Sequence, residues 1–248
     1  MKKYKLTTET LQFAGRTLHR IKAVKDFDSI KAGEFGGWIE NEKNLSQDDN
    51  AWIYGDAMVF DNAEVFDNAE VFDNAKVYGN AEVYGNANVS GNAEVYGNAN
   101  VFGYANVSGY ANVFGHANVS DYANVFGYAN VSGYANVFGH AEVYGNAEVY
   151  GNANVFGNAK VYGNAAIKGD AKVHDAVDYI VFKNFWSSGR YFTWTSSNNK
   201  WSVGCFYGTG EELIKKAYAD SEKSGREYER VVRYVESILA DEKKEKSN

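Results

Sequence analysis

Aliphatic residues recur at every sixth position along the middle of the chain, without a break from Ile53 to Val173. These 21 hexads follow the form V-(Y/F/S)-(G/D)-N-A-x, in which x is mostly Glu, Asn or Lys. In a stretch such as Ala93-Glu94-Val95-Tyr96, Ala and Val fall on one face of a short strand and Glu and Tyr on the other. Because a charged residue at x cannot lie unpaired in a dry interior, Ala and Val are predicted to face inward and the rings outward.

Two residues, Gly-Asn or Asp-Asn, separate each predicted strand from the next. Gly adopts the left-handed conformation without a Cβ penalty, and Asn tolerates it better than most residues, so this pair predicts a corner. A bulky residue in the Asn slot would then carry backbone strain of about 1 kcal/mol. Because every strand has the same polarity of pattern, the corners predict a coil and not a series of hairpins.

The hexad, with its aliphatic residue first, Asn fourth and Ala fifth, resembles the hexapeptide repeat of left-handed parallel β-helices. In that family three hexads form one triangular coil of 18 residues, and the resemblance implies about seven coils here. At a strand spacing of about 4.8 Å they would form a prism about 33 Å long. The left-handed crossover is implied by the resemblance alone. The expected fold class is therefore mainly β: a left-handed parallel β-helix with an N-terminal β-rich cap and a small C-terminal α+β module.

The N-terminal segment departs from the repeat and is expected to cover the unpaired strand edges at the open end of the β-helix. The segments KYKLTTETLQFAG and RTLHRIKAVKDF each predict a strand. The stretch KAGEFGGWIENEKNLSQDDNAWIYGDA resembles the N-terminal part of uncharacterised phage and bacterial hexapeptide-repeat proteins, some of which are labelled acyltransferases. Its GGW triplet is expected to allow close backbone packing, with Trp38 covering the first coil. The expected units are residues 1–50, 51–176 and 177–248.

The C-terminal unit is expected to contain three strands followed by two helices, and to cap the second end of the β-helix. The strands are predicted at DYIVFKNF, RYFTWTSS and KWSVGCFYG. Thr209 with Glu212 and Ser224 with Glu227 have the spacing of capping boxes at helix starts. The apolar stripe of the second helix comprises Tyr228, Val231, Val235, Ile238 and Leu239.

Composition narrows the range of partners and compartments. The 248 residues carry 25 basic and 32 acidic side chains, a net charge of −7. Because no basic stripe could neutralise a phosphate backbone, we expect no nucleic-acid polymer as a partner. Cys205 is the single cysteine and cannot form an internal disulfide. The start MKKYKLTTET lacks the apolar run of a signal peptide or membrane helix, so a cytoplasmic location without membrane contact is expected, in the host cytoplasm if the protein is phage-encoded.

Enzymes built from this repeat give the main catalytic hypothesis. Many left-handed β-helix enzymes are acyltransferases with a coenzyme A thioester, a catalytic His and a loop excursion, whereas the hexads here are uninterrupted. The γ-type carbonic anhydrases of this fold bind zinc with three His, at a spacing that the four histidines here do not offer: His19, His116, His140 and His174. We therefore expect no catalytic residue, no metal and no cofactor. An acyltransferase stays an alternative through fold resemblance alone.

Charged side chains disappear from the middle of the repeat. Between residues 95 and 141, Asp121 is the only formally charged side chain. Seven successive corners of this segment replace Asn by a ring: Tyr104, Tyr110, His116, Tyr122, Tyr128, Tyr134 and His140. The x slots hold Asn106, Asn112, Asn118, Asn124, Asn130 and Asn136. We call residues 102–140 the belt.

Stacking between coils is one interpretation of the belt. With 18 residues per coil, the corner rings fall into three columns: Tyr104, Tyr122 and His140; Tyr110 and Tyr128; His116 and Tyr134. Rings one strand spacing apart gain about 0.5–1.5 kcal/mol per pair, which would offset the corner strain. Repeated Asn side chains can form amide ladders. Stacking explains the rings without a ligand, but it does not explain the loss of charge.

A binding surface is the other interpretation, because an uncharged surface rich in rings and amides is typical of interaction sites. Ser120 interrupts an outward aromatic column between Phe102 and Phe138, which predicts a notch about one base or sugar wide. Similar notches are expected at Ser108 and Ser132. Phe102 and Phe138 would sandwich a planar ligand.

The predicted function is therefore a non-enzymatic binding or assembly protein that acts through the belt. Its partner would be a small planar or nucleotide-like ligand or a host protein, as for a phage-encoded inhibitor or sponge that acts on host defence. One alternative is a structural homo-oligomer such as a trimer, and the other is a hexapeptide-repeat acyltransferase. Hydrogen bonds to the ligand are expected from Tyr104, Tyr122, Asn118 and Ser120, and polarity at the rim from His140 and Asp121. The full set of candidate residues is Phe102, Tyr104, Tyr110, His116, Asn118, Ser120, Asp121, Tyr122, Tyr128, Tyr134, Phe138 and His140.

Overall fold

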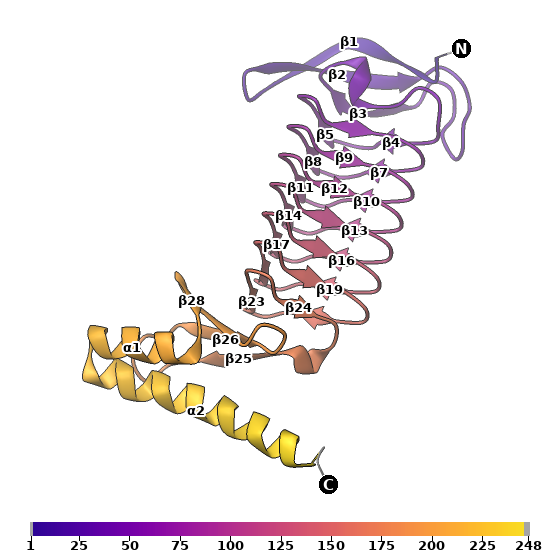
Figure 1. Ribbon diagram of the computed structural model, residues 1–248. Coiled ribbons are helices and arrows are strands. Elements are labelled where there is room, and N and C mark those ends of the chain that lie inside the picture. The colour runs from indigo at the N-terminus through magenta and orange to yellow at the C-terminus, as the bar shows by residue number, and fades with distance from the viewer. Residues whose placement is uncertain (1, 246–248) are drawn as a thin grey trace.

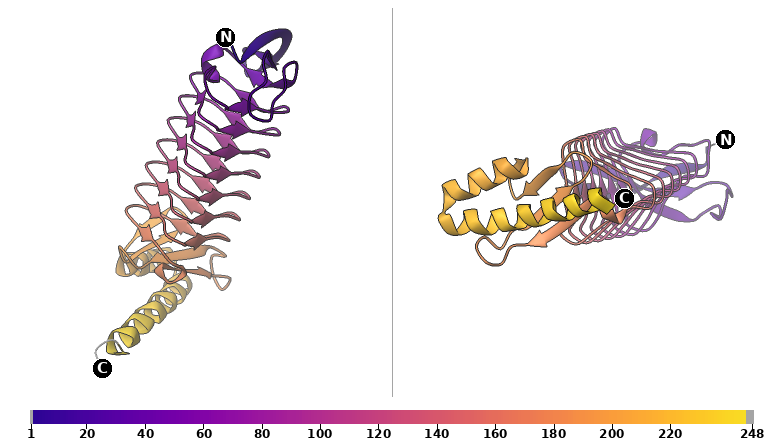
Figure 2. Two further views of the ribbon diagram at one scale, coloured as in Figure 1. Left: turned by 90° about the vertical axis from the view of Figure 1, so that its right-hand side faces the viewer. Right: turned by 60° about the horizontal axis from the view of Figure 1, so that its bottom comes forward.

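The computed structural model describes residues 2–245, in which a straight stack of triangular coils joins two caps (Figures 1 and 2). The stack is a parallel β-helix with three sheets, one on each side of the prism. Partners in neighbouring coils are 18 residues apart, as in the pairing of Asn100 with Asn118 and of Asn118 with Asn136. The expected mainly β fold with 18-residue coils is confirmed.

Each sheet takes one strand from every coil. Sheet 1 contains β3 (Phe35–Ile39), β5 (Met58–Val59), β8 (Lys76–Val77), β11 (Glu94–Val95), β14 (Asn112–Val113), β17 (Asn130–Val131), β20 (Glu148–Val149) and β23 (Ala166–Ile167). Sheet 2 contains β4 (Trp52–Ile53), β7 (Glu70–Val71), β10 (Asn88–Val89), β13 (Asn106–Val107), β16 (Asn124–Val125), β19 (Glu142–Val143) and β22 (Lys160–Val161). Sheet 3 contains β6 (Glu64–Val65), β9 (Glu82–Val83), β12 (Asn100–Val101), β15 (Asn118–Val119), β18 (Asn136–Val137), β21 (Asn154–Val155) and β24 (Lys172–Val173).

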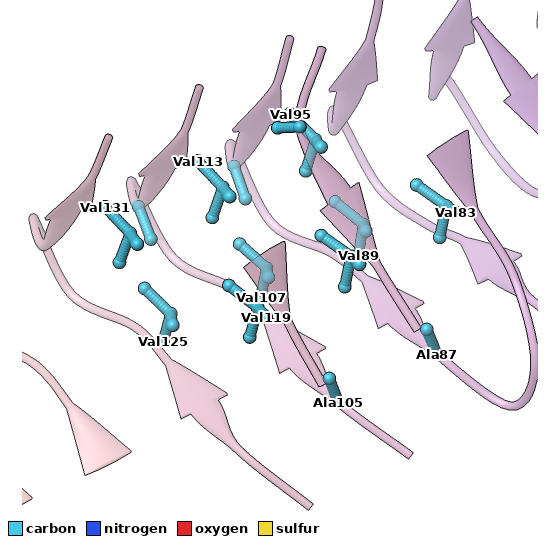
Figure 3. Packing of buried hydrophobic residues seen from close by; sticks show 14 of the residues in the cluster. Val83, Ala87, Val89, Val95, Ala105, Val107, Val113, Val119, Val125 and Val131 are labelled. Atoms are coloured by element: carbon cyan, nitrogen blue, oxygen red, sulfur yellow. The ribbon is translucent and has the colours of Figure 1, made fainter. Parts of the chain in front are cut away.

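The interior of the prism is a dry tube of Ala and Val. Side chains from all three sheets meet there (Figure 3), and the Ala and Val residues of the hexads are 0% or 1% exposed. The x residues and the rings lie on the outside, as the alternation predicts. Burial of each Val contributes about 1.5–3 kcal/mol before the entropy of ordering the chain is subtracted.

Backbone hydrogen bonds tie each coil to the following one and hold the 18-residue register. The N–H groups of Asn118, Ser120 and Tyr122 each donate to a carbonyl of the next coil at 2.9 Å. Outside the two-residue strands, all such bonds between coils run in this direction, from an N–H to a carbonyl nearer the C-terminus. The stack therefore presents free carbonyls at its N-terminal end and free N–H groups at its C-terminal end.

The left-handed residue of each corner is in the Gly slot and not in the Asn slot. Gly103 has φ +72°, and a Cβ there would lie 2.9 Å from the backbone nitrogen of Asp121 in the next coil. The positive-φ residues of the repeat are Gly or Asp, and they include none of the corner rings. The prediction of backbone strain at those rings is therefore wrong, because the positive φ angle lies at the preceding Gly or Asp and not at the ring residue.

The repeat begins earlier than the hexad pattern indicates. β3 pairs in parallel with β5, with Ile39 beside Val59, and Leu45 forms a parallel bridge with Val65, so residues before 51 add a further turn to the seven coils. Gly36 permits this turn, since a Cβ there would lie 2.6 Å from the carbonyl oxygen of Ile53. Trp38 is buried, but it packs outside the tube with Leu18 and Phe60.

The N-terminal cap supplies hydrogen-bond donors to the carbonyl end of the stack. The two strands predicted here are present as β1 (Tyr4–Phe13) and β2 (Arg16–Ala23), and they pair antiparallel. β2 continues sheet 1 beyond β3. A short 3-10 helix, η1 (Glu42–Asn44), follows β3. The ammonium of Lys3 donates to the carbonyls of Asp49 (2.9 Å) and Ala51 (2.8 Å). The hydroxyl of Tyr4 donates to the carbonyl of Leu45 (2.7 Å).

The C-terminal module follows the order expected from the sequence, with two corrections. Its elements are η2 (Ala176–Asp178), β25 (Tyr179–Lys183), β26 (Tyr191–Thr195), β27 (Lys200–Val203), β28 (Phe206–Gly208), α1 (Gly210–Asp220) and α2 (Glu222–Glu245). KWSVGCFYG forms two strands, because Gly204 (φ +55°) turns the chain between them. Thr209 and Glu212 cap α1 as predicted. The expected start at Ser224 is wrong, since α2 already begins at Glu222.

This module supplies acceptors to the N–H end of the stack. The hydroxyl of Thr193 accepts from the N–H of Ala166 (2.9 Å), and that of Ser197 accepts from the N–H of Lys172 (2.7 Å). Ala166 lies in the last strand of sheet 1 and Lys172 in the last strand of sheet 3. The carboxylate of Asp178 accepts from the N–H of His174 (2.7 Å). The acceptors at this end and the donors at the other end match the direction of the hydrogen bonds between the coils.

Within residues 2–245 no helix is long and apolar enough to cross a bilayer.

Lys3 is expected to make the stability of the protein depend on pH above neutrality. Burial lowers its pKa to about 8, and Asp49 opposes this shift. Between pH 8 and about 10.4, the value in an unfolded chain, the unfolded state binds more protons. The free energy of unfolding therefore rises with pH through this group, by at most about 1.4 kcal/mol per pH unit.

Urea unfolding of wild type and Lys3→Met between pH 7.5 and 9.5 measures this contribution. The wild type is expected to gain stability relative to Lys3→Met as the pH rises. Lys5→Met removes an exposed lysine of the adjoining strand β1 and serves as the control. Parallel pH profiles for wild type and Lys3→Met would contradict the assignment.

Candidate binding surface

The corner rings of the belt form three stacked columns, in the register that the 18-residue coil predicts. Centroids are 5.1 Å apart for Tyr104 and Tyr122 and 5.0 Å apart for Tyr122 and His140. The second column pairs Tyr110 with Tyr128 at 4.9 Å. In the third, His116 lies 4.7 Å from Tyr134. His116 and His140 therefore lie at different corners, and each stacks on a tyrosine.

These rings project into solvent. The five corner tyrosines of the belt are between 51% and 61% exposed, although they stack on one another. Asn occupies the same slot in most other coils, and the backbone at the rings is unstrained. The fold therefore accepts either residue at these corners, and it does not require rings.

Sheet 3 carries the most regular part of the belt. The amides of Asn100, Asn118, Asn136 and Asn154 form a continuous ladder with hydrogen bonds of 3.0, 3.0 and 3.2 Å. Asn100, Asn118 and Asn136 each donate one N–H to the next amide of the ladder. The amide of Asn136 also donates to the carbonyl of Tyr134, whereas Asn118 keeps its second N–H for a partner. The ladder extends one coil beyond the belt at each end. Asn100 and Asn154 were not among the residues predicted from the sequence, although their 18-residue spacing from Asn118 and Asn136 places them in the same ladder.

Beside the ladder, Ser120 interrupts the column of outward rings. Phe102 stacks on Tyr84 at 5.0 Å, and Phe138 stacks on Phe156 at 5.2 Å, so each ring is covered on the side away from Ser120. Strand pairing places Ser120 at the level between Phe102 and Phe138. The gap is two ring steps long, about 10 Å at the spacing of the ladder. It leaves one face of each phenylalanine without a neighbour.

Serine also interrupts the other two ring columns, once on sheet 1 and twice in succession on sheet 2. On sheet 1, Ser132 lies between Phe114 and Tyr150 and leaves a gap one ring wide. On sheet 2, Ser90 and Ser108 are adjacent, so the gap there is two rings wide. The single notch expected at Ser108 is therefore part of a wider gap that includes Ser90.

Asp121 has a structural role in its corner. It occupies the Gly slot with φ +58°, and its carboxylate accepts from the N–H of Gly139 in the next coil at 3.1 Å. Asp67 and Asp73 make the same contact with Gly85 (3.1 Å) and Gly91 (3.0 Å). The single formal charge of the belt is therefore engaged in closing a corner, although it was expected to supply polarity at the rim of a binding site.

Cavities of about 350, 420 and 520 Å³ lie outside the belt, beside α2, against β1 and beneath the C-terminal sheet. In residues 2–245 no group of three or more His, Cys, Asp or Glu side chains could hold a metal ion. The belt presents exposed corner rings and gaps in its ring columns, as described above.

The fold and this surface define a hexapeptide-repeat parallel β-helix with capped ends and an uncharged belt of rings and amides. No protein-family model matches the chain. The chain is similar to the uncharacterized acetyltransferase YdcK of Escherichia coli (strain K12), with 39% identity over 62 residues. That match covers 22% of this chain and 19% of the relative, so the chain spans about a fifth of the length of the protein it matches.

The role of Asp121 predicts losses of different size for two substitutions. Asp121→Ala keeps a Cβ at positive φ but removes the acceptor for Gly139, and it is expected to lower the free energy of unfolding by about 1–2 kcal/mol. Asp121→Gly also removes the acceptor but relieves the backbone strain, so its effect should stay within about 0.5 kcal/mol. Urea unfolding at pH 7 measures both. Equal losses in the two variants would contradict the structural role.

Proposed function

We propose that this protein is a non-enzymatic binding or assembly protein whose partner docks on the sheet 3 side of the belt. The supporting observation is the coincidence of three features on one face: the amide ladder, the gap at Ser120 and the lack of charge. The rest of the chain acts as a rigid scaffold for that face.

The distribution of charge favours sheet 3 over the other faces. On sheet 3 four uncharged x residues, from Asn100 to Asn154, lie between Glu82 and Lys172. Sheet 2 has three such residues between Glu70 and Glu142, and sheet 1 has two between Glu94 and Glu148. Charges are depleted in the centre of interfaces, while aromatic residues are enriched there. Sheet 3 therefore offers the longest surface of this composition.

The gap at Ser120 suits a planar group. A ring that enters it takes the place of the missing rung and contacts Phe102 on one side and Phe138 on the other. Each such ring contact contributes about 0.5–1.5 kcal/mol beyond the area that it buries. The hydroxyl of Ser120 and the free amide N–H of Asn118 can hydrogen-bond to its edge. A nucleobase has this shape and polarity, as does an aromatic side chain of a host protein, and a phage-encoded inhibitor or sponge is one form of such a binder.

Self-association is the second candidate, and the exposed corner tyrosines favour it. They occur at all three corners of the prism, whereas a small ligand needs only one face. A homo-oligomer, such as a trimer, would cover several corners at once.

The relative's name adds acetyl transfer as a third hypothesis. It rests on a short match and on the fold. The belt histidines do not form a shared site, since each lies at its own corner.

Ser120→Phe tests the proposed face, because it fills the gap and completes the stack from Phe66 to Phe156. It is expected to raise the free energy of unfolding by about 1–3 kcal/mol through two new ring contacts and to abolish partner binding. Ser132→Phe makes the same change on sheet 1 and should leave binding intact. Native mass spectrometry of protein purified from cells reports both the number of chains and any bound molecule.

The outcomes separate the candidates. A bound molecule lost in Ser120→Phe but kept in Ser132→Phe supports capture, whereas loss of an oligomer in Ser120→Phe supports assembly through sheet 3. If Ser120→Phe and Phe102→Ala/Phe138→Ala both kept the wild-type mass and bound molecules, the proposal would be wrong.

A further inference from the structure

The C-terminal module forms a second candidate site, separate from the belt, where it meets the last coils. The module extends sideways from the end of the stack (Figure 1), with β26 packed against β23. The hydroxyl of Tyr207 on β28 donates to the carbonyl of Lys168 at 3.2 Å and holds the two parts together. Between them lies a cleft of about 520 Å³, lined by sheet 1 residues such as Glu148 and by residues of β26 and β27.

Two cations flank one glycine of this cleft. Lys168 is 7% exposed, and its ammonium donates to the carbonyl of Gly204 at 2.9 Å. The side chain of Arg190 packs on the same glycine, with Nε 3.7 Å and Cζ 4.0 Å from the position that a Cβ of Gly204 would take. In residues 2–245, no carboxylate lies within ion-pairing distance of either cation. The ammonium also lies 4.7 Å from the ring centroid of Tyr150.

Ser202 adds an unused hydrogen-bonding group to the lining of the cleft. Its side chain is buried, with 4% of the residue exposed. Among the buried side-chain polar atoms of residues 2–245, the hydroxyl oxygen of Ser202 has no hydrogen-bond partner. A buried hydroxyl without a partner destabilises a fold, and native structures contain few of them. A ligand that reached this hydroxyl would remove that cost.

We propose that this cleft binds a small molecule through an oxyanion, a phosphate ester or a carboxylate, held by Arg190 and Lys168. A guanidinium presents two parallel N–H groups to two oxygens, and the ammonium of Lys168 has N–H groups beyond the one given to Gly204. The hydroxyl of Ser202 donates to the same anion or to the atom that carries it. Burial lowers the pKa of Lys168, whereas Glu148 opposes this shift and favours the charged form.

The test is a titration of the 248-residue chain, labelled with ¹⁵N, at constant ionic strength. Inorganic phosphate and acetate are added in separate arms, with chloride as the reference. Saturable shifts of the Gly204 and Ser202 amide signals are expected with phosphate or acetate and not with chloride. Tighter binding of phosphate indicates a phosphate ester as the ligand class, and tighter binding of acetate indicates a carboxylate.

Arg190→Gln should weaken this binding about tenfold or more, because a charge-assisted bidentate contact is lost. Arg226→Gln makes the same change at an exposed arginine of α2 and should stay within about twofold of wild type. Ser202→Ala should weaken binding and also raise the melting temperature of the ligand-free protein, since it removes the unpartnered hydroxyl. Absence of a saturable shift with either anion, or equal affinities in wild type and Arg190→Gln, would overturn the proposal.

Discussion

The packing of Ala and Val inside a narrow tube is the constraint on which the other features of this protein depend. Both residues are small, and each recurs every six residues, so that three repeats complete a coil of 18 residues. Each coil therefore lies directly over the preceding one. Every outward slot then becomes a column one strand spacing apart. A run of identical residues at one slot becomes a ladder, and a single exception becomes a gap in it. The amide ladder and the gap at Ser120 both arise in this way.

The direction of the bonds between coils explains the difference between the two caps. Because N–H groups outside the strands donate toward the C-terminus, one end of the stack needs donors and the other needs acceptors. Lys3 and Tyr4 provide the donors, and Thr193, Ser197 and Asp178 provide the acceptors. Side chains thus replace the coil that is missing at each end, which leaves fewer open strand edges for aggregation.

The periodic part of the molecule could be predicted from the sequence, because there local pattern and global fold coincide. The inward Ala and Val followed from residue spacing. The resemblance to hexapeptide-repeat β-helices implied the 18-residue coil, and the three ring columns followed from that coil length. The rest depends on contacts between distant segments. The extra turn of Gly36 and Ile39 has no hexad signal, and the engagement of Asp121 is visible only when Gly139 lies above it. Lys168 and Arg190 meet at Gly204 only after the C-terminal module docks.

Cysteine scanning across one hexad tests most directly whether rings and amides lie outside a dry tube. In a Cys205→Ser background, single cysteines at residues 117 to 122 are treated with a thiol reagent under native conditions, and the rate of modification is measured. The account predicts slow modification at Ala117 and Val119 and fast modification at Asn118, Ser120 and Tyr122. Fast modification at Val119 together with protection at Ser120 and Tyr122 would contradict it, since the proposed face would then be part of the interior.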